Sequence, residues 1–178
     1  MAQRTENPVC LSEEQKDFIV VVAAKLEEIL RFKRRPSKSI APGERVQQAV
    51  MLLHGQGGSG KTEVVLILRQ LMKEFNIVVE AVAATNSAAR VIEGDTVHSA
   101  LILGRMTTLN LRALDRNVGT ELTDRWKDVA ALIVEEVSMV SPKMLGALSF
   151  RTCIARRQVP GARPDRDTLP GFLVASPS

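Results

Sequence analysis

The stretch HGQGGSGKT at residues 54–62 decides the fold of this chain. It fits the phosphate-binding pattern G-x-x-x-x-G-K-S/T, whose glycines let successive backbone amides curl around a phosphate, because no Cβ obstructs the approach and positive φ costs little. The lysine supplies a point charge for the phosphates, and the threonine supplies a hydroxyl for Mg²⁺. The pattern therefore predicts a nucleotide site, and its candidate residues are Gly55, Gly57, Gly58, Ser59, Gly60, Lys61 and Thr62.

Apolar segments flank this loop on both sides. Residues 49–53 (AVMLL) form a short continuous apolar run, which is typical of a buried parallel strand. In residues 61–75 the side chains of Val64, Leu68 and Leu71 recur at helical spacing. A helix that begins there turns its first amides toward the same anion. The order of strand, glycine loop and helix favours a nucleotide site over a chance match to the pattern.

Two later apolar runs predict further strands, and polar residues follow each of them. Residues 77–84 lead into TNS at 85–87, and residues 129–134 lead into Glu135 and Glu136. Strands that alternate with helices form a right-handed parallel α/β unit, whose ligands bind at the carboxyl ends of the strands. We therefore expect the loop, residues 85–87 and the paired acids to lie along one edge of the sheet.

The paired acids favour hydrolysis over transfer of a phosphoryl group to a small acceptor. One carboxylate near the phosphate loop can hold Mg²⁺ through its water ligands, because this ion keeps much of its hydration shell. The second carboxylate can orient and deprotonate the water that attacks the γ-phosphate. The alternative interpretation of Glu135 and Glu136 is a solvated turn at the end of a strand.

Composition sets outer bounds on the class of protein. The chain has 178 residues and a formal net charge of +4, which is ordinary for one globular domain. No apolar run is long enough to cross a membrane, so no membrane partner is expected. The first ten residues lack the apolar region of a secretory signal. The two cysteines and two histidines form no metal-ligand cluster, so we expect neither a zinc site nor a disulfide framework.

Basic residues gather in two stretches, which are either solvated faces or contacts to a polyanion. They are Arg31, Lys33, Arg34, Arg35 and Lys38, and Arg151, Arg156, Arg157, Arg163 and Arg166. Aromatic residues make up only 3% of the chain, so any grip on a single strand would depend more on phosphate contacts than on stacking.

Three regions are expected along the chain. They are a disordered start at residues 1–10, a phosphate-loop domain at residues 11–150, and an irregular tail, rich in Arg, Pro and Gly, at residues 151–178. Ser12 as an N-cap, with Gln15 at the capping-box position, predicts that the domain opens with a helix that continues to about residue 32. Pro142 suits a first helical position and predicts a helix through about residue 150.

Five segments together resemble, in order and rough spacing, the first motor lobe of PIF-type, RecD-like DNA helicases. They are LSEEQ at 11–15, the phosphate loop at 55–62, AATNSAAR at 83–90, GDTVHSA at 94–100 and LIVEEVSMV at 132–140. The resemblance covers roughly residues 11–150. Its most specific part is the third and fifth segments combined with the loop, since the loop alone is shared by many nucleotide-binding families.

The resemblance implies a RecA-like phosphate-loop NTPase fold, with a parallel sheet flanked by helices, and ATP and Mg²⁺ as ligands. In that family the early glutamine reads adenine, which falls on Gln15. The metal-holding residues fall on Thr62 and Glu135, and the catalytic residues on Lys61, Glu135 and Glu136. The residues implied to contact single-stranded DNA are Thr85, Asn86, Thr96 and His98, although a lone histidine is more often structural.

Two departures from the family pattern stand out. Where the family has Asp-Glu, this chain has Glu135-Glu136, so the metal-holding acid is longer by one methylene, and in-line chemistry is sensitive to such shifts. After residue 150 nothing resembles the family's later motifs or its second lobe. We therefore expect an incomplete, marginally stable lobe whose partner lobe is absent. Residues 171–175 (GFLVA) are the only remaining apolar run that could fill the sheet between the loop-bearing and acid-bearing strands.

The sequence therefore predicts an ATP-hydrolysing motor lobe that acts on single-stranded DNA or DNA junctions. The resemblance implies roles in DNA repair, recombination and telomere maintenance, in the nucleus or, alternatively, the mitochondrion. Two other interpretations stay open. One is a catalytically incomplete ATP- or DNA-binding remnant, and the other is a small phosphate-loop kinase.

Overall fold

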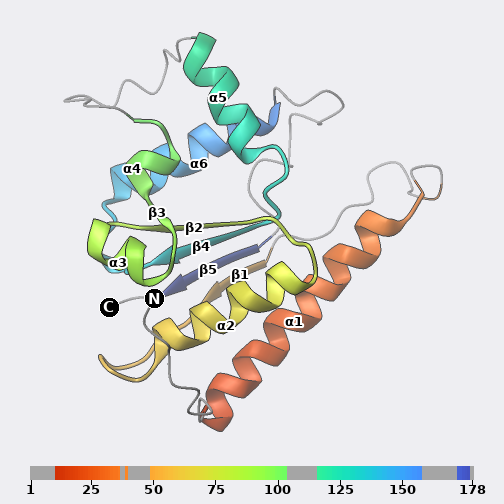
Figure 1. Ribbon diagram of the computed structural model, residues 1–178, viewed down its shortest axis with the longest axis vertical. Coiled ribbons are helices and arrows are strands. Elements are labelled where there is room, and N and C mark those ends of the chain that lie inside the picture. Colours follow the sequence, from red (N-terminus) through yellow and green to blue (C-terminus); the bar gives the residue numbers. More distant parts are fainter. Residues whose placement is uncertain (1–10, 37–38, 40–48, 104–115, 158–171, 177–178) are drawn as a thin grey trace, which may run out of the picture.

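The computed structural model describes residues 11–36, 39, 49–103, 116–157 and 172–176. Its helices and strands follow in chain order (Figure 1). They are α1 (Glu13–Arg34), β1 (Ala49–Leu52), α2 (Lys61–Glu74), β2 (Val79–Ala83), α3 (Asn86–Val91), β3 (Asp95–Thr96), α4 (Val97–Ala100), α5 (Arg116–Trp126), β4 (Ala131–Glu135), the 3₁₀ helix η2 (Val137–Met139), α6 (Pro142–Arg157) and β5 (Phe172–Ser176).

The five strands form one parallel sheet in the order β1-β5-β4-β2-β3. This confirms the predicted parallel α/β architecture. β5 lies between β1 and β4, with Leu173 beside Val50 on one side and Leu132 on the other. The apolar run expected to fill the gap between the loop-bearing and acid-bearing strands therefore fills it.

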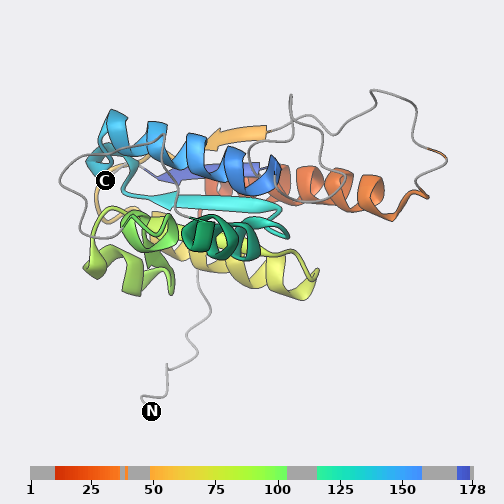
Figure 2. The ribbon, with the colours of Figure 1, turned by 90° about the horizontal axis from the view of Figure 1, so that it is seen from above.

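Helices cover both faces of the sheet (Figures 1 and 2). Successive side chains of a strand point to opposite faces, so one strand serves two cores. In β4, Ala131 and Ile133 pack in the cluster formed with α1, α2 and α3, whereas Leu132 and Val134 pack in the cluster formed with α4, α5 and α6. Both clusters are made almost wholly of aliphatic side chains, and together they fix the carboxyl edge of the sheet that carries the candidate site.

The capping box at the start of α1 is confirmed. The Ser12 hydroxyl accepts a hydrogen bond from the Gln15 amide at 3.3 Å, and the Ser12 amide donates to Oε1 of Gln15 at 2.9 Å. This reciprocal pair satisfies amides that the first turn leaves without helical partners. The helix then continues to Arg34, two residues beyond the predicted end.

The predicted irregular tail after residue 150 is wrong at two places. α6 continues to Arg157, and residues 172–176 form the strand β5. The irregular tail was predicted from its content of Arg, Pro and Gly. Arg151 and Thr152 are buried in α6, where their polar atoms donate to backbone carbonyls inside the fold. The remaining tail residues, the disordered start predicted at residues 1–10, and Lys38 of the first basic stretch lie outside the described residues.

One further local prediction needs correction, and one helix was not predicted. β1 is not fully buried, since Val50 is 67% exposed and Leu52 is 59% exposed. Among the described strands β1 is the end strand of the sheet, and its outward-facing residues are therefore uncovered on the α6 side. No helix was predicted between residues 101 and 128, yet α5 forms there and buries Leu122 and Trp126, one helical turn apart.

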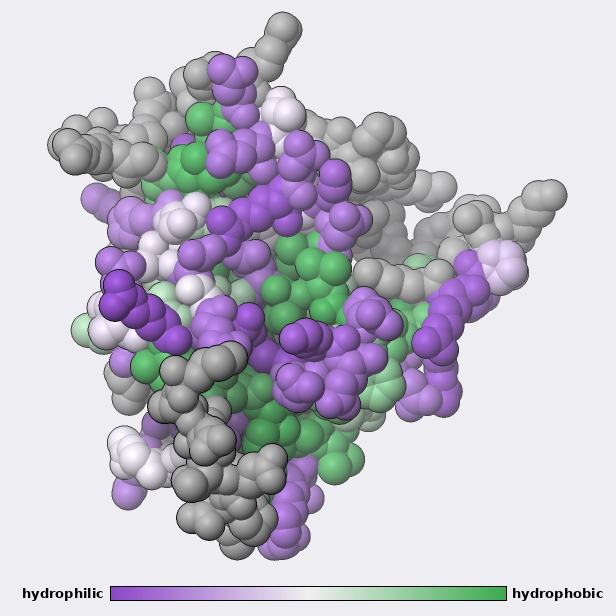
Figure 3. All heavy atoms as spheres, in the orientation of Figure 1, coloured by the Kyte–Doolittle hydropathy of each residue, from purple (hydrophilic) through white to green (hydrophobic). Residues whose placement is uncertain are grey.

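The surface is mostly polar on the side that carries α2 and α5, with apolar residues visible between the polar ones (Figure 3). No helix within the described part of the chain is both long enough and apolar enough to cross a membrane.

Candidate functional site

The phosphate loop has the backbone that its glycines predict. Gly58 has φ of +76° and Gly60 has φ of +79°, a region that L side chains rarely adopt. Gly60 is the N-cap of α2, so the first amides of that helix face the space enclosed by the loop. A Cβ on Gly55 would lie 2.8 Å from Oγ of Ser59, so that glycine allows the two ends of the loop to approach closely. The loop and the helix together form a site suited to an anion.

Lys61, the first residue of α2, folds back over this loop. Its Nζ donates hydrogen bonds to the carbonyls of Gly55 and Gln56, both at 2.9 Å. These contacts hold the ammonium group beside the loop backbone, where the charge is available to phosphate oxygens.

Thr62 and Glu135 meet across the sheet. The Thr62 hydroxyl donates to Oε1 of Glu135 at 3.1 Å, and Glu135 is only 6% exposed. Glu135 is the last residue of β4, so the strand itself delivers the carboxylate to the loop. A hydroxyl and a carboxylate oxygen side by side form the type of donor set that Mg²⁺ prefers.

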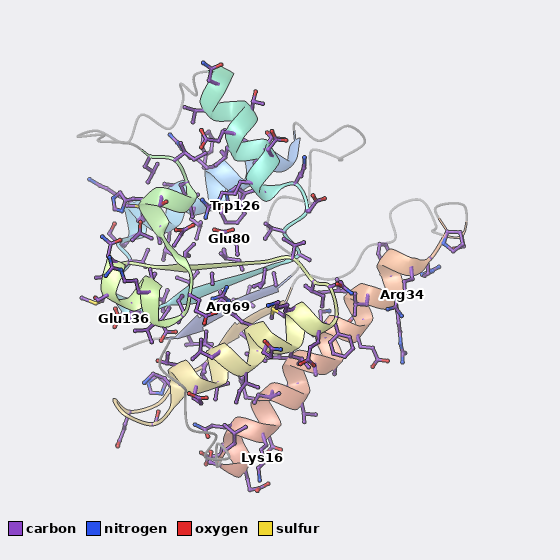
Figure 4. All side chains as sticks on the ribbon, in the orientation of Figure 1. Lys16, Arg34, Arg69, Glu80, Trp126 and Glu136 are labelled. Atoms are coloured by element: carbon purple, nitrogen blue, oxygen red, sulfur yellow. The ribbon has the colours of Figure 1, made fainter. Side chains whose placement is uncertain are left out.

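Glu136 follows in a left-handed conformation, with φ of 52° and ψ of 47°. For a residue other than glycine this conformation costs about 1–2 kcal/mol. Asn76, Glu93 and Ile102 also have positive φ, so the conformation alone does not mark a functional site. The turn ends β4 and directs the chain into η2 and α6. Figure 4 shows Glu136 on the side of the molecule where α3 begins, beyond the carboxyl ends of the strands.

A cavity of about 790 Å³ lies between the start of α1 and the phosphate loop. Its size falls within the range of small-molecule sites. Nε2 of Gln15 donates to the carbonyl of Ser59 at 2.8 Å, which ties α1 to the loop. The lining residues are Leu11, Ser12, Glu14, Gln15, Phe18, Leu52, Leu53, His54, Gly55, Gly58, Ser59, Gly60, Lys61 and Glu63. The cavity therefore unites Gln15 with Lys61 and most of the loop glycines, whereas Thr62, Glu135 and Glu136 do not line it.

The predicted DNA-contacting residues lie along the same edge of the sheet. Strand register places Ala83, two residues before Thr85, beside both Glu135 and Thr96. Asn86 and His98 are exposed there. The carboxyl ends of β2, β3 and β4 thus form one continuous edge, as expected for a parallel sheet.

Two of these residues also have a local structural task. The Thr85 hydroxyl accepts from the Ala88 amide at 3.2 Å and caps α3. The Thr96 hydroxyl accepts from the Ser99 amide at 3.2 Å and caps α4. The capping explains why threonines suit these positions, and a DNA-contacting role for them stays a prediction.

One basic residue does not lie where the charge pattern suggested. Arg151 is 3% exposed and points into the fold, so it cannot belong to a surface patch for a polyanion. The helical spacing of Arg151 with Ala147, Leu148 and Ala155, all buried, was the available signal that it lies on the inner face of α6.

Comparisons with known proteins agree with this architecture. A family model described as an AAA domain matches residues 43–159. The ATP-dependent DNA helicase PIF1 of Saccharomyces cerevisiae (strain YJM789) is 30% identical over 156 residues, which cover 84% of this chain and 15% of that protein. These matches confirm the resemblance seen in the sequence.

Solved structures agree as well. The Pif1 helicase from Candida albicans superimposes with a TM-score of 0.65 at 22% identity, over 96% of this chain and 33% of that one. The Pif1 helicase from Bacteroides in complex with ADP-AlF3 and ssDNA has a TM-score of 0.61 at 18% identity, over 95% of this chain and 32% of that one. These structures confirm the RecA-like fold class. The chain spans a third or less of the length of these relatives.

Proposed function

Because this chain belongs to the AAA domain family, we propose that it is the ATP-binding and ATP-hydrolysing motor lobe of a PIF-type DNA helicase. The observation that carries the proposal is the hydrogen bond between Thr62 and Glu135 at the mouth of the phosphate loop. It joins the loop that binds phosphate to the acidic pair that hydrolysis requires.

The residues present fit ATP. The two glycines with positive φ shape the loop, Lys61 holds its ammonium group over the loop carbonyls, and a cavity between α1 and the loop has room for a nucleoside. In this proposal Lys61 binds the β- and γ-phosphates, and Gln15, at the cavity wall, contacts adenine. Gln15 keeps capacity for this, since a primary amide has two N–H groups and two lone pairs and each end forms one described bond.

Thr62 and Glu135 would hold Mg²⁺, because their hydroxyl and carboxylate oxygens lie side by side and oxygen is the ligand atom that this ion prefers. At that position Mg²⁺ would supply positive charge that offsets the charge on the phosphate oxygens. Glu136 orients the attacking water and accepts its proton at a carboxylate oxygen, while the water oxygen bonds to the γ-phosphorus and the bond to the ADP oxygen breaks. The products are ADP and inorganic phosphate.

Thr85, Asn86, Thr96 and His98 contact single-stranded DNA or the single-stranded part of a junction in this proposal. Their common position on the nucleotide edge supports it, because a ligand there lies close to the acids that respond to ATP. The Bacteroides relative was solved with ssDNA. Further parts of the proposal derive from the resemblance alone. They are the coupling of hydrolysis to unwinding, a second motor lobe as partner, roles in DNA repair, recombination and telomere maintenance, and a nuclear or mitochondrial location.

ATP turnover by the 178-residue chain, measured with and without a single-stranded oligonucleotide, tests the proposal. Stimulation by the oligonucleotide is expected, and Glu136→Gln should abolish it. Turnover that requires a small-molecule acceptor would favour the kinase alternative. ATP binding without turnover would favour the catalytically incomplete alternative, for which the replacement of Asp by Glu135 is the specific observation.

A further inference from the structure

A short segment at residues 94–103, here called the β3–α4 segment, carries two of the proposed DNA contacts. It is attached to the sheet at only two register positions, Asp95 beside Val82 and Thr96 beside Ala83. It begins at Gly94, where a Cβ would lie 2.3 Å from the carbonyl oxygen of Ala81. Only a residue without a side chain permits so close an approach of the two backbones. So little strand pairing leaves most of the segment to be held by other groups.

The carbonyls of residues 97–99 accept hydrogen bonds from backbone amides of the same segment. The amides of residues 101–103 donate to the carbonyls of Val97, Ser99 and His98 at 3.1, 3.0 and 3.0 Å respectively. Such bonds are usual at the C-terminal end of a helix. The carbonyls of the next three residues, Ala100, Leu101 and Ile102, have no backbone donor of this kind among the described residues.

Side chains from α5 and α6 satisfy those three carbonyls. Nε1 of Trp126 donates to the Ala100 carbonyl at 3.0 Å. Nη1 of Arg151 donates to the carbonyl of Leu101 at 2.7 Å and to that of Ile102 at 3.1 Å. The carbonyls at the end of the helical turn are therefore held by two large side chains from helices remote in sequence. At the other end of the segment, Arg125 of α5 pairs with Asp95 and with Glu80 of β2.

The use of Arg151 to bind two carbonyls carries the free-energy cost of burying a charged group. Arg151 is buried, and no carboxylate among the described residues forms an ion pair with it. Burial lowers the pKa of its guanidinium group. A buried charge without a counter-ion opposes folding, and apolar residues of similar volume often serve stability as well or better. The contact therefore suggests a task other than stability alone.

The orientation of the segment indicates that task. Val97, Ala100 and Leu101 are fully buried in the core shared with α5 and α6, whereas His98 and Ser99 are exposed. Anchoring the inner side fixes where the outer side projects. Figure 4 shows Trp126 and Glu80 between α5 and the sheet.

We propose that Arg151, assisted by Trp126, is a positioning residue for single-stranded DNA, because it holds the β3–α4 segment so that Thr96 and His98 project along the nucleotide edge of the sheet. This inference rests on the proposed function, since it assumes that these two residues contact DNA. Arg151 itself touches no DNA.

The test compares Arg151→Met, Arg151→Lys and Trp126→Phe in the 178-residue chain. Arg151→Met removes the charge and both hydrogen bonds at similar volume, and Arg151→Lys retains a donor. The matched control is Thr152→Val, which removes a buried hydrogen bond to the Leu148 carbonyl in the same helix without touching the segment. Affinity for an oligo(dT) strand, affinity for ATP, and amide hydrogen exchange of residues 97–103 are measured for each.

We expect Arg151→Met to weaken oligo(dT) binding about tenfold and to speed exchange in residues 97–103, with ATP affinity unchanged. Trp126→Phe should act in the same direction, Arg151→Lys should restore part of the affinity, and Thr152→Val should bind DNA like the wild type. Wild-type DNA affinity in Arg151→Met and Trp126→Phe, or an equal loss in Thr152→Val, overturns the inference.

His98→Ala separates this inference from the proposed function. If His98→Ala weakens oligo(dT) binding while Arg151→Met does not, the proposed function stands and the positioning role is wrong. If the wild-type chain binds no oligo(dT) at all, the DNA part of the proposed function is wrong and the positioning role is wrong with it.

Discussion

The hydroxyl of Thr62 donates a hydrogen bond to Oε1 of Glu135 at 3.1 Å, across 73 residues of sequence. One partner lies in the first turn of the helix that follows the phosphate loop, and the other ends the acid-bearing strand. β5 separates β1 from β4 in the sheet, so this side-chain contact links the loop to β4 over the top of an intervening strand. The glutamate, longer than the aspartate of the family pattern, reaches the threonine directly.

Thr62→Val should therefore weaken both folding and nucleotide binding. Valine keeps the volume but removes the donor to a buried carboxylate, and hydrogen bonds to charged groups contribute about 1.5–3 kcal/mol. We expect a loss of that order in the free energy of unfolding, measured with urea, and weaker binding of Mg-ATP by calorimetry. Thr62→Ser retains the hydroxyl and is the matched control. Equal effects of the two substitutions would argue against the contact.

Glu136→Gln should abolish turnover without abolishing binding. The amide keeps the shape and the left-handed backbone of this position but cannot accept a proton from water. We expect turnover to fall by about 10²–10⁴-fold, the usual contribution of a general base. ATP affinity should remain within a small factor of the wild type. A glutamine variant that hydrolyses ATP at the wild-type rate would remove Glu136 from the mechanism.

Variants of Ser12 and Gln15 distinguish the cap of α1 from the hydrogen bond between Gln15 and the Ser59 carbonyl of the loop. Ser12→Ala removes only the capping hydroxyl and should lower stability by about 1 kcal/mol. Gln15→Ala removes the cap and also the bond from Nε2 to the Ser59 carbonyl, so ATP affinity should fall as well. Titration of ATP and GTP against both variants measures this. If the two variants lose ATP affinity equally, the hydrogen bond from Gln15 to the Ser59 carbonyl has no role in ATP binding.

Glu80 should make stability depend on pH. Burial is the largest influence on its carboxyl and raises the pKa above the ordinary value of 4.5, with Arg125 acting in the opposite direction. The native state then holds the proton more tightly than the unfolded chain, so this group's contribution to stability falls as pH rises upward from about 4.5.

Glu80→Gln removes this dependence because glutamine does not titrate. The difference in urea midpoint between the variant and the wild type should shift in favour of the variant from about pH 4 to about pH 7. A difference that is constant across this range would mean that the pKa of Glu80 is not raised.

Local signals in the sequence were enough to predict the elements around the phosphate loop. The glycine loop, the apolar strand before it and the capping box of α1 each depend on neighbours within a few residues, and all three were predicted at the correct positions. The acidic pair was correctly placed at the end of its strand for the same reason, although Glu135 belongs to the strand itself.

The features that could not be predicted from the sequence depend on contacts between residues far apart in the chain. β3 exists because Gly94 lets the chain approach Ala81, a contact no local pattern encodes. The helical turn of α4 depends on carbonyl partners from α5 and α6, and Arg151 resembled a surface residue because its partners are backbone groups. Pairing of β5 with strands far earlier in the chain was expected only as a way to fill a gap.

The central claim is that the loop at residues 54–62 holds ATP through Lys61. Binding of Mg-ATP to the wild-type chain and to Lys61→Ala, measured by isothermal titration calorimetry, tests it most directly. Saturable binding by the wild type and a loss of at least about tenfold in affinity for the variant is the predicted result. Equal ATP affinity in Lys61→Ala and in the wild type would contradict the account.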